Sequence, residues 1–254
     1  PLRRIMCVLD GESLPIELGE GITCSNTTSG HRFMGSGPFE VKSFAEYQNQ
    51  LERNKVVLDA ACRMKLIEAK SLELAEADGF TLKNDSGLLA EVCGLVEWPV
   101  PLLGKIDDDF MSLPDEVLTT SMRSHQKYFS VLAEDGKLAP RFVVVANIET
   151  ADGGAEILRG TERVLRARLA DAKFFWDQDL KNTMESRVPS LSQMIFHEKL
   201  GSLYQKVERL KGLSKEIAQT INADPEKSMR AAYLCKADLM TGMVGEFANL
   251  QGVM

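Results

Sequence analysis

Histidine, cysteine and tryptophan are scarce in this sequence. Its 254 residues include three histidines, five cysteines and two tryptophans. No C-x-x-C pair occurs, which excludes a zinc ribbon and a dithiol redox motif, and we expect free thiols in a reducing cytoplasm. The histidines are too scattered to predict a metal site by spacing. The cysteines are Cys7, Cys24, Cys62, Cys93 and Cys235, and the histidines are His31, His125 and His197.

Long apolar runs and phosphate-binding loops are missing as well. The longest runs are short, as in Phe142–Ala146, so the sequence predicts no transmembrane helix, and it begins without a secretory signal region. The nucleotide-binding loops G-x-x-x-x-G-K-[ST] and G-x-G-x-x-G do not occur, nor does the G-x-S-x-G of a serine hydrolase. ATP binding through a known loop is therefore not expected. The chain begins with Pro1 rather than Met, and its abrupt ends indicate a part of a longer gene product.

Charge is distributed unevenly along a chain of otherwise ordinary composition. Hydrophobic residues make up 44% and charged residues 26%, as in a globular protein with one large domain or two modest ones. The formal net charge of −7 argues against a protein that coats nucleic acid, DNA included, by bulk charge. Residues 159–215 nevertheless hold 12 basic and 7 acidic residues, whereas the remainder holds 18 and 30. The sequence therefore predicts a basic face on an acidic protein.

Residues 1–150 predict a strand-rich α+β domain. Apolar or alternating stretches bounded by turn residues indicate strands, and Phe142–Ala146 predicts a central strand covered on both faces. Ser43, with Glu46 three residues later, begins a helical pattern that ends at Gly79 and forms either one long helix or two with a kink. The other expected elements are strands at Arg4–Leu9, Ser13–Leu18, Val92–Pro99 and Gln126–Leu132, a turn at Asp10–Glu12 and a short helix from Pro114.

Residues 151–254 predict an all-helical domain. Helical patterns cover Ala155–Asp179, Val188–Ile221 and Pro225–Phe247, and no strand signal follows Gly153. This change of pattern places the domain boundary near residue 150.

A dense group of arginines lies in the first of these helices. Arg159, Arg163 and Arg166 follow the i, i+4, i+7 spacing that brings side chains to one helical face. Guanidinium groups in such a row suit an RNA backbone, where phosphate contacts supply much of the affinity. The alternative is a solvated face with intrahelical pairs, such as Arg168 with Asp171.

Three other motifs allow a functional reading. Phe174–Trp176 either stacks on bases or, at helical spacing, packs in the core. His31 and Arg32 lie in a turn, where they either contact a ligand or pin the loop by hydrogen bonds. Ser124–Tyr128 combines a serine, a histidine, Lys127 and a tyrosine, but no partner carboxylate or oxyanion site is evident for a nucleophilic serine.

The spacing of His197 and Asp238 resembles that of a helical phosphohydrolase, in which a histidine, a His-Asp pair and a later aspartate bind metal. Ala237 occupies the place of the second histidine. Loss of one imidazole leaves too few ligands for a tight divalent site. The sequence thus predicts a helical scaffold of that type without metal or catalysis.

Several short motifs follow one another in a characteristic order along the chain. They are Gly30–Gly35, Leu95–Val100, Gln126–Phe129, Val145–Glu149, Arg168–Phe175, Lys236–Thr241, Glu246–Phe247 and Leu250–Met254. Together these motifs closely resemble the β subunit of the bacterial two-subunit glycyl-tRNA synthetase. The resemblance covers almost the whole chain and implies an internal part of a much longer subunit.

This resemblance implies an α2β2 enzyme that joins glycine to tRNA(Gly) with ATP and magnesium. The α subunit would carry out adenylation and transfer, and the β subunit would bind tRNA and dock on α, so no catalytic, cofactor or metal residue is expected here. Residues 1–150 are expected to resemble the editing module of phenylalanyl-tRNA synthetase β, and residues 151–254 a truncated, degenerate HD phosphohydrolase. The candidate tRNA-binding residues are Arg159, Arg163, Arg166, Arg168, His31, Arg32 and Lys127, and the degenerate HD positions are His197 and Asp238.

Two hypotheses of different classes follow from these observations. The first is a tRNA-binding, α-docking part of a cytoplasmic ligase subunit, inactive on its own. The second is a hydrolytic module that edits mischarged tRNA or cleaves phosphates with a metal. The sequence favours the first because it offers a basic face but no complete catalytic constellation. It leaves open which surface meets tRNA or α, and whether the chain forms oligomers.

Overall fold

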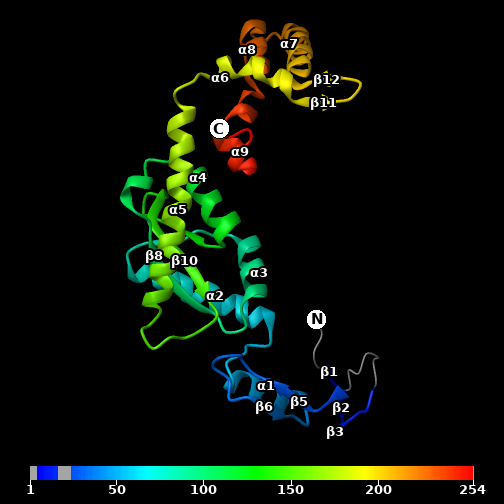
Figure 1. Ribbon diagram of the computed structural model, residues 1–254, viewed down its shortest axis with the longest axis vertical. Helices are drawn as coiled ribbons and strands as arrows, with labels where there is room; N and C mark the ends of the chain where they lie inside the picture. The colour runs from blue at the N-terminus through cyan, green and yellow to red at the C-terminus, as the bar shows by residue number, and fades with distance from the viewer. Residues whose placement is uncertain (1–4, 17–23, 254) are drawn as a thin grey trace. The chain divides into compact units, whose positions relative to one another are not determined.

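The computed structural model describes residues 5–16 and 24–253, and the chain divides into two compact units (Figure 1). The sheet unit comprises residues 1–106 and 127–163, and the helical unit comprises residues 107–126 and 164–254. This division differs from the boundary expected near residue 150, because residues 107–126 make their contacts with segments far along the chain. Within the described ranges, no helix combines the length and the apolar character needed to cross a bilayer.

A four-stranded antiparallel sheet forms the centre of the sheet unit. Its order is β7 (Thr81–Leu82), β9 (Phe129–Leu132), β10 (Leu138–Ala146) and β8 (Val100–Lys105). The central position predicted for Phe142–Ala146 is confirmed, since β10 pairs with both β9 and β8. Phe142 and Val143 are fully buried, whereas the last three residues of the strand are half-buried.

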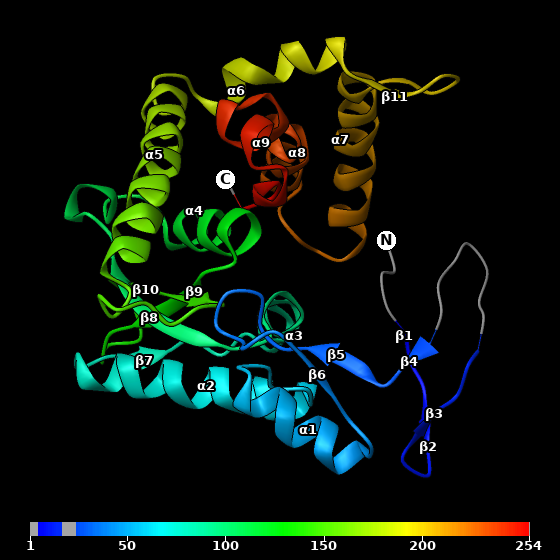
Figure 2. The same cartoon turned by 60° about the horizontal axis from the view of Figure 1, so that its bottom comes forward.

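Two helices cover the sheet with apolar side chains. α2 (Ala60–Ala77) runs along one face of the sheet (Figure 2), and α3 (Ser86–Leu95) packs against α2. Apolar burial of this kind is worth roughly 25 cal/mol per Å² of area removed from water. The buried core that they share with the sheet contains Ile67, Ala75, Leu88, Val92, Phe129, Val131 and Val143.

The helical pattern from Ser43 to Gly79 forms two separate helices. α1 (Phe44–Arg53) begins at Ser43, whose side chain accepts a hydrogen bond from the backbone N–H of Glu46, as predicted. α2 has its own cap, because the Asp59 side chain accepts from Cys62 N. Between them Lys55 takes a left-handed backbone conformation, with φ 62°, which ends the first helix.

The strand predicted at Val92–Pro99 is wrong, because α3 occupies the first half of that segment and no strand lies between Val96 and Pro99. Asp85 accepts a hydrogen bond from Leu88 N at 2.8 Å and caps the helix. Leu88 and Val92, four residues apart, then share the buried face. A short apolar run does not distinguish a strand from a buried helix by periodicity, so the cap was the decisive signal.

Short β-ladders occur in the part of residues 5–40 that the structure describes. The turn predicted at Asp10–Glu12 is confirmed by the hairpin of β2 (Val8–Leu9) and β3 (Glu12–Ser13), with positive φ at Asp10 and Gly11. β1 (Ile5–Met6) pairs in parallel with β4 (Cys24–Ser25), and β5 (Thr27–Ser29) pairs with β6 (Pro38–Glu40). Of the strands expected at Arg4–Leu9 and Ser13–Leu18, residues 4, 17 and 18 lie outside the described residues.

Helix α5 (Ala155–Asp179) has the bounds that the sequence predicted. Its first nine residues belong to the sheet unit, where the Glu162 carboxylate accepts a hydrogen bond from Lys105 N at 2.9 Å. The short helix expected from Pro114 is α4 (Asp115–Thr120), followed by a π-helical turn at Ser121–Gln126. That turn shortens the strand predicted at Gln126–Leu132 to β9.

The helix predicted at Val188–Ile221 is wrong for residues 188–202. A 3₁₀ segment (Val188–Gln193) precedes a hairpin of β11 (Ile195–His197) and β12 (Gly201–Ser202). Strands of two and three residues leave no alternating pattern to read. α7 (Leu203–Thr220) then starts at a Ser202 capping box, and the remaining helices are α6 (Met184–Arg187), α8 (Pro225–Leu234) and α9 (Gly242–Glu246).

Asp152 anchors the start of α5 through both carboxylate oxygens. Oδ1 accepts from Thr150 Oγ1 and from Gly154 N, and Oδ2 accepts from Glu156 N at 2.8 Å. These bonds, first that of Thr150, lower the pKa of Asp152 from 3.8 to about 2. Because the folded-state pKa lies below the unfolded one, the carboxylate stabilises the fold above about pH 4, and this contribution disappears as the pH falls toward 2.

We therefore expect Asp152→Asn to lower the urea midpoint of unfolding at neutral pH. The difference from wild type should shrink as the pH falls from about 4 to 2, because the wild-type carboxylate becomes protonated there. Urea titrations at a series of pH values measure this. Asp171→Asn, which replaces an exposed carboxylate within α5, is the control. A pH-independent difference would contradict the assignment.

Candidate nucleic-acid interface

The predicted arginine face of α5 is partly neutralised within the protein. Arg159 pairs with Glu156 at 2.9 Å, one turn away on the same helix. Arg166 forms a two-pronged bond to Asp107, with its Nη2 3.0 Å from Oδ1. The hydrogen bond from Arg166 is the main reason that the pKa of Asp107 is lowered. Two of the three arginines on this face therefore already hold a carboxylate.

Arg163 and Arg168 are the exposed arginines that keep their charge available. Among the residues that the structure describes, neither makes an ion pair, so the expected pairing of Arg168 with Asp171 is not observed. Arg168 lies nine residues after Arg159, which places it on the other side of the helix. The predicted row thus becomes two free guanidinium groups on different sides of α5.

His31 is buried and holds the loop of residues 30–37. It is 3% exposed, and its Nε2 lies 2.6 Å from the backbone oxygen of Asn147. Its Nδ1 accepts hydrogen bonds from the backbone N–H groups of Phe33 and Met34, at 3.2 and 3.1 Å. Because Nδ1 accepts, Nε2 carries the proton and donates to Asn147. Of the two roles open for His31, the structure supports the one that pins the loop.

Asn54 holds the other side of the same loop. Its Oδ1 accepts from Ser36 N at 2.9 Å and from Ser36 Oγ at 2.6 Å, while its backbone oxygen accepts from His31 N at 2.8 Å. A Cβ at Gly30 would lie 2.2 Å from the Asn54 Cβ, so only glycine permits this approach. The loop is therefore fixed from two directions by buried amide and imidazole groups.

This anchoring leaves Arg32 and Phe33 at the exposed tip of the loop. The Phe33 side chain is 73% exposed, and the Arg32 guanidinium lies 5.5 Å from the centroid of its ring. The sequence placed His31, Arg32 and Phe33 in one candidate turn, but only His31 and Arg32 were predicted to bind tRNA. The available signal was an aromatic residue between two glycines of a turn.

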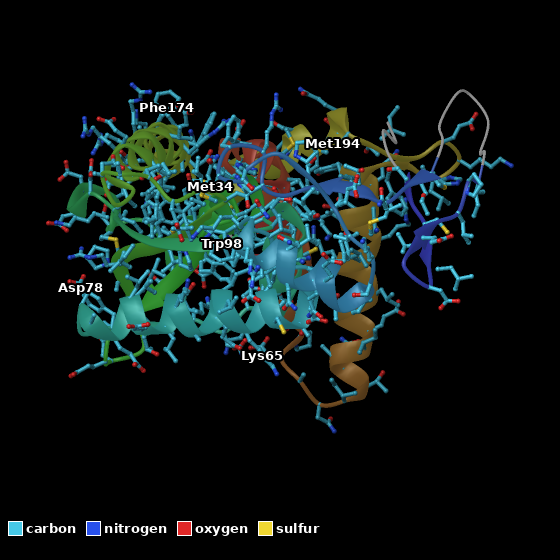
Figure 3. The ribbon with its side chains drawn as sticks, turned by 90° about the horizontal axis from the view of Figure 1, so that it is seen from below. Met34, Lys65, Asp78, Trp98, Phe174 and Met194 are labelled. Carbon is cyan, nitrogen blue, oxygen red and sulfur yellow. The ribbon has the colours of Figure 1, made fainter. Side chains whose placement is uncertain are left out.

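Polar groups near the loop form a network of hydrogen bonds and one ion pair. Glu149 accepts from Trp98 Nε1 at 2.9 Å and pairs with Lys55 Nζ at 3.1 Å, and these two bonds, first that of Trp98, lower the pKa of Glu149. Met34 Sδ accepts from Glu149 N at 3.3 Å, which links the loop to this network; Met34 and Trp98 are labelled in Figure 3. The Asn147 side chain completes it by accepting from Glu97 N and Trp98 N.

Lys127, the remaining basic candidate of the sheet unit, is already paired. Its Nζ lies 2.7 Å from Glu91 Oε1, and its backbone has a positive φ of 59°. The adjacent Tyr128 is buried and stacks on Phe142 with ring centroids 4.7 Å apart, and burial raises the pKa of Tyr128. In the helical unit, the His125 ring stacks on Phe247 at 5.5 Å.

The two degenerate HD positions have different surroundings. His197 lies in the exposed hairpin, where its Nδ1 accepts from Lys199 N. Asp238 is 5% exposed and its Oδ2 accepts from Gly252 N at 2.6 Å. Ala237 packs in a core cluster with Val188 and other apolar residues. Within residues 5–16 and 24–253, no three side chains of the metal-binding types gather into a group.

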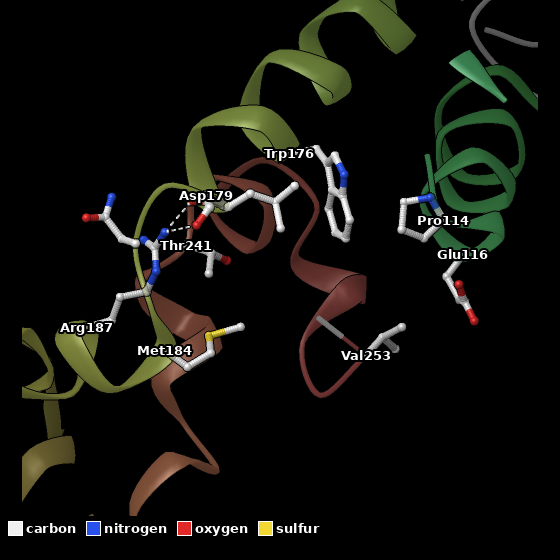
Figure 4. A pocket seen from close by; sticks show the side chains of 10 residues that line it. Pro114, Glu116, Trp176, Asp179, Met184, Arg187, Thr241 and Val253 are labelled. Carbon is white, nitrogen blue, oxygen red and sulfur yellow. Dashed lines mark hydrogen bonds and ion pairs between the residues drawn. The ribbon is translucent and has the colours of Figure 1, made fainter. Parts of the chain in front are cut away.

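The helical unit contains a mainly apolar cavity of about 300 Å³ (Figure 4). Trp176, Leu180 and Met184 line it, and the Asp179–Arg187 ion pair lies at one end. Both carboxylate oxygens of Asp179 also accept backbone N–H groups at the start of α9, so these polar groups are satisfied internally.

The three residues of the aromatic run Phe174–Trp176 differ in burial. Phe174 is 58% exposed, whereas Phe175 lies so close to Gly242 that a Cβ there would be 2.7 Å from its ring. Trp176 lines the cavity. Phe174 is therefore the most exposed of the three aromatic side chains.

Comparison with known proteins identifies the family. A family model described as "Glycyl-tRNA synthetase beta subunit" matches residues 1–254. Relatives named "Glycine--tRNA ligase beta subunit" include those of Rhodospirillum centenum (49% identical over 280 residues), Phenylobacterium zucineum (50% over 259) and Trichlorobacter lovleyi (45% over 255). These alignments cover 100% of this chain and 39%, 39% and 37% of the relatives, so the chain spans less than two-fifths of their length. The chain therefore belongs to the glycyl-tRNA synthetase β-subunit family.

Proposed function

We propose that this chain is the part of a cytoplasmic glycine–tRNA ligase β subunit that binds tRNA(Gly) and docks on the catalytic α subunit. The match of the family model to residues 1–254 carries this proposal. ATP and magnesium would be used by the whole α2β2 enzyme, at an adenylation site on α. We also propose that the sheet unit is related to the editing module of phenylalanyl-tRNA synthetase β, and the helical unit to a degenerate HD phosphohydrolase.

Free basic side chains support tRNA binding through α5. RNA presents a row of phosphates, and each lysine or arginine that neutralises one releases a counterion. Arg163 and Arg168 are exposed and, among the described residues, without a carboxylate partner, so they can bind phosphate without first breaking an ion pair. Arg159 and Arg166 would have to leave Glu156 and Asp107.

We expect the four arginine variants to differ according to these partners. Arg163→Ala and Arg168→Ala should each weaken tRNA binding and flatten the plot of log affinity against log salt by about one unit. Arg159→Ala and Arg166→Ala should change the slope less, because their charge is already balanced. Fluorescence anisotropy with labelled tRNA over a salt series measures both quantities.

The matched control lies on the same helix. Asp171→Asn removes an exposed charge of opposite sign and should not flatten the slope. If all four arginine variants bind tRNA at low salt as wild type does, the face is a solvated one and does not contact RNA. Deacylation of a mischarged tRNA by the wild-type chain would support the hydrolytic hypothesis instead.

A further inference from the structure

The tip of the loop at residues 30–37 is exposed and immobilised at the same time. Isolated exposed apolar side chains are common on protein surfaces and need no explanation of their own. Phe33 differs because its own backbone N–H is bonded to the buried His31 ring, and the loop is also bonded to Asn54 on its other side. The backbone entropy of forming this loop is thus lost on folding, before any partner binds.

The chemistry at the tip is that of a flat ring beside a free cation. Arg32 is exposed and has no ion pair within the described part of the chain, and its guanidinium contacts the Phe33 ring. Aromatic rings stack on nucleic-acid bases at about 1–3 kcal/mol per base. Arginine binds phosphate through a planar fork of donors. The pair therefore offers one surface for a base and one for the phosphate next to it.

We propose that Arg32 and Phe33 form a platform for one unpaired nucleotide of an RNA strand, with the base on Phe33 and its phosphate on Arg32. The proposal rests on the tRNA binding proposed above and specifies one contact of it. Stacking on an exposed ring requires a base with an open face, which single-stranded RNA provides and the interior of a duplex does not. His31 and Asn54 act as positioning residues, because both are buried and hold the backbone of the loop from its inner side.

The surroundings of Phe33 favour RNA over a protein partner. A protein interface surrounds its aromatic anchor with further apolar area and a rim that excludes water. Between residues 24 and 42, all of which the structure describes, Phe33 is the only exposed large apolar residue. Its neighbours in sequence are Arg32 and Met34, followed by Gly35 and Ser36, and the half-buried Met34 turns its sulfur to the backbone N–H of Glu149. A single ring in a polar loop suits one base better than an apolar partner surface.

Replacement of Phe33 tests the platform. Phe33→Leu keeps an apolar side chain but removes the ring face, so we expect about tenfold or greater loss of affinity for a single-stranded RNA oligonucleotide. Phe33→Trp should bind as tightly as wild type or more so. The salt slope should be unchanged by Phe33→Leu, since stacking is not ionic, but reduced by about one unit by Arg32→Ala. Phe44→Leu, at another exposed phenylalanine (71%), is the matched control and should bind normally.

Three outcomes would overturn the platform. One is equal binding of the oligonucleotide by wild type and Phe33→Leu. Another is equal loss for duplex RNA of the same length. The third is that Phe33→Leu no longer retains the α subunit on a sizing column but still binds RNA as wild type does, which would make the loop a protein contact. In each of these cases wild-type tRNA binding still supports the proposed function; failure of the wild-type chain to bind tRNA even at low salt would overturn both.

Discussion

Replacing Asp179 with alanine is expected to destabilise the helical unit by about 3 kcal/mol or more. Asp179 and Arg187 have side chains that are 14% and 13% exposed, with 3.1 Å between Oδ1 and Nη2. Removal of the carboxylate leaves a largely buried guanidinium without its counter-charge. It also leaves the N–H groups of Gly242 and Met243 without the acceptors that begin α9. Unpaired buried charge and unpaired donors are among the most costly defects that one substitution can cause.

Urea unfolding followed by tryptophan fluorescence measures this loss. Trp176 lies in the helical unit beside Asp179, so a Trp98→Phe background makes it the only reporter. Glu185→Ala is the control, because it breaks an ion pair to Arg230 whose two side chains are 55% and 51% exposed and should change the midpoint little. Joint replacement, Asp179→Leu with Arg187→Met, should recover part of the loss, because no charge is then left buried.

Equal midpoints for Asp179→Ala and Glu185→Ala would show that the Asp179–Arg187 pair contributes no more than an exposed one. A double variant less stable than Asp179→Ala would point instead to tight packing around the cavity as the dominant contribution.

Replacing His31 with alanine is expected to destabilise the sheet unit by about 3 kcal/mol. The buried backbone oxygen of Asn147 loses its donor, and the N–H groups of Phe33 and Met34 lose their acceptor. The vacated ring volume adds the cost of a cavity, since His31 is only 3% exposed. The loop should therefore become more mobile, and the sheet unit should become less stable.

Two measurements separate these effects. Fluorescence of Trp98 in a Trp176→Phe background reports unfolding of the sheet unit, and hydrogen exchange reports the amides of Phe33 and Met34. Both amides should exchange faster in His31→Ala, ahead of global unfolding. Arg32→Ala is the control, because its side chain is exposed and its loss should leave the midpoint unchanged. Identical midpoints for His31→Ala and Arg32→Ala would contradict the role of His31 as the anchor.

Local signals in the sequence were sufficient for several elements. The bounds of α5, the start of α4 after Pro114 and the turn at Asp10–Glu12 all depend on caps, proline or turn residues within a few positions. The central place of β10 followed from one continuous apolar run. The family also followed from the sequence, since its motifs are read in order without knowledge of their contacts.

Other elements depended on partners remote in the chain. Half of the segment at Val92–Pro99 became helix because its apolar residues meet α2, and the hairpin after residue 194 is too short to leave a pattern. Residues 107–126 joined the helical unit through contacts that no local signal encodes.

The candidate site shows the same distinction in its side chains. Residue spacing alone predicts that arginines gather on α5 and that a glycine-bounded turn carries His31, Arg32 and an aromatic residue. Which of these groups are free depends on contacts between segments that are remote in the chain. Arg166 is neutralised by Asp107, 59 residues away, and His31 is buried by its bond to Asn147, 116 residues away. Spacing along the chain fixes which side chains share a helical face, but the charge and exposure of each depend on what folding brings against it.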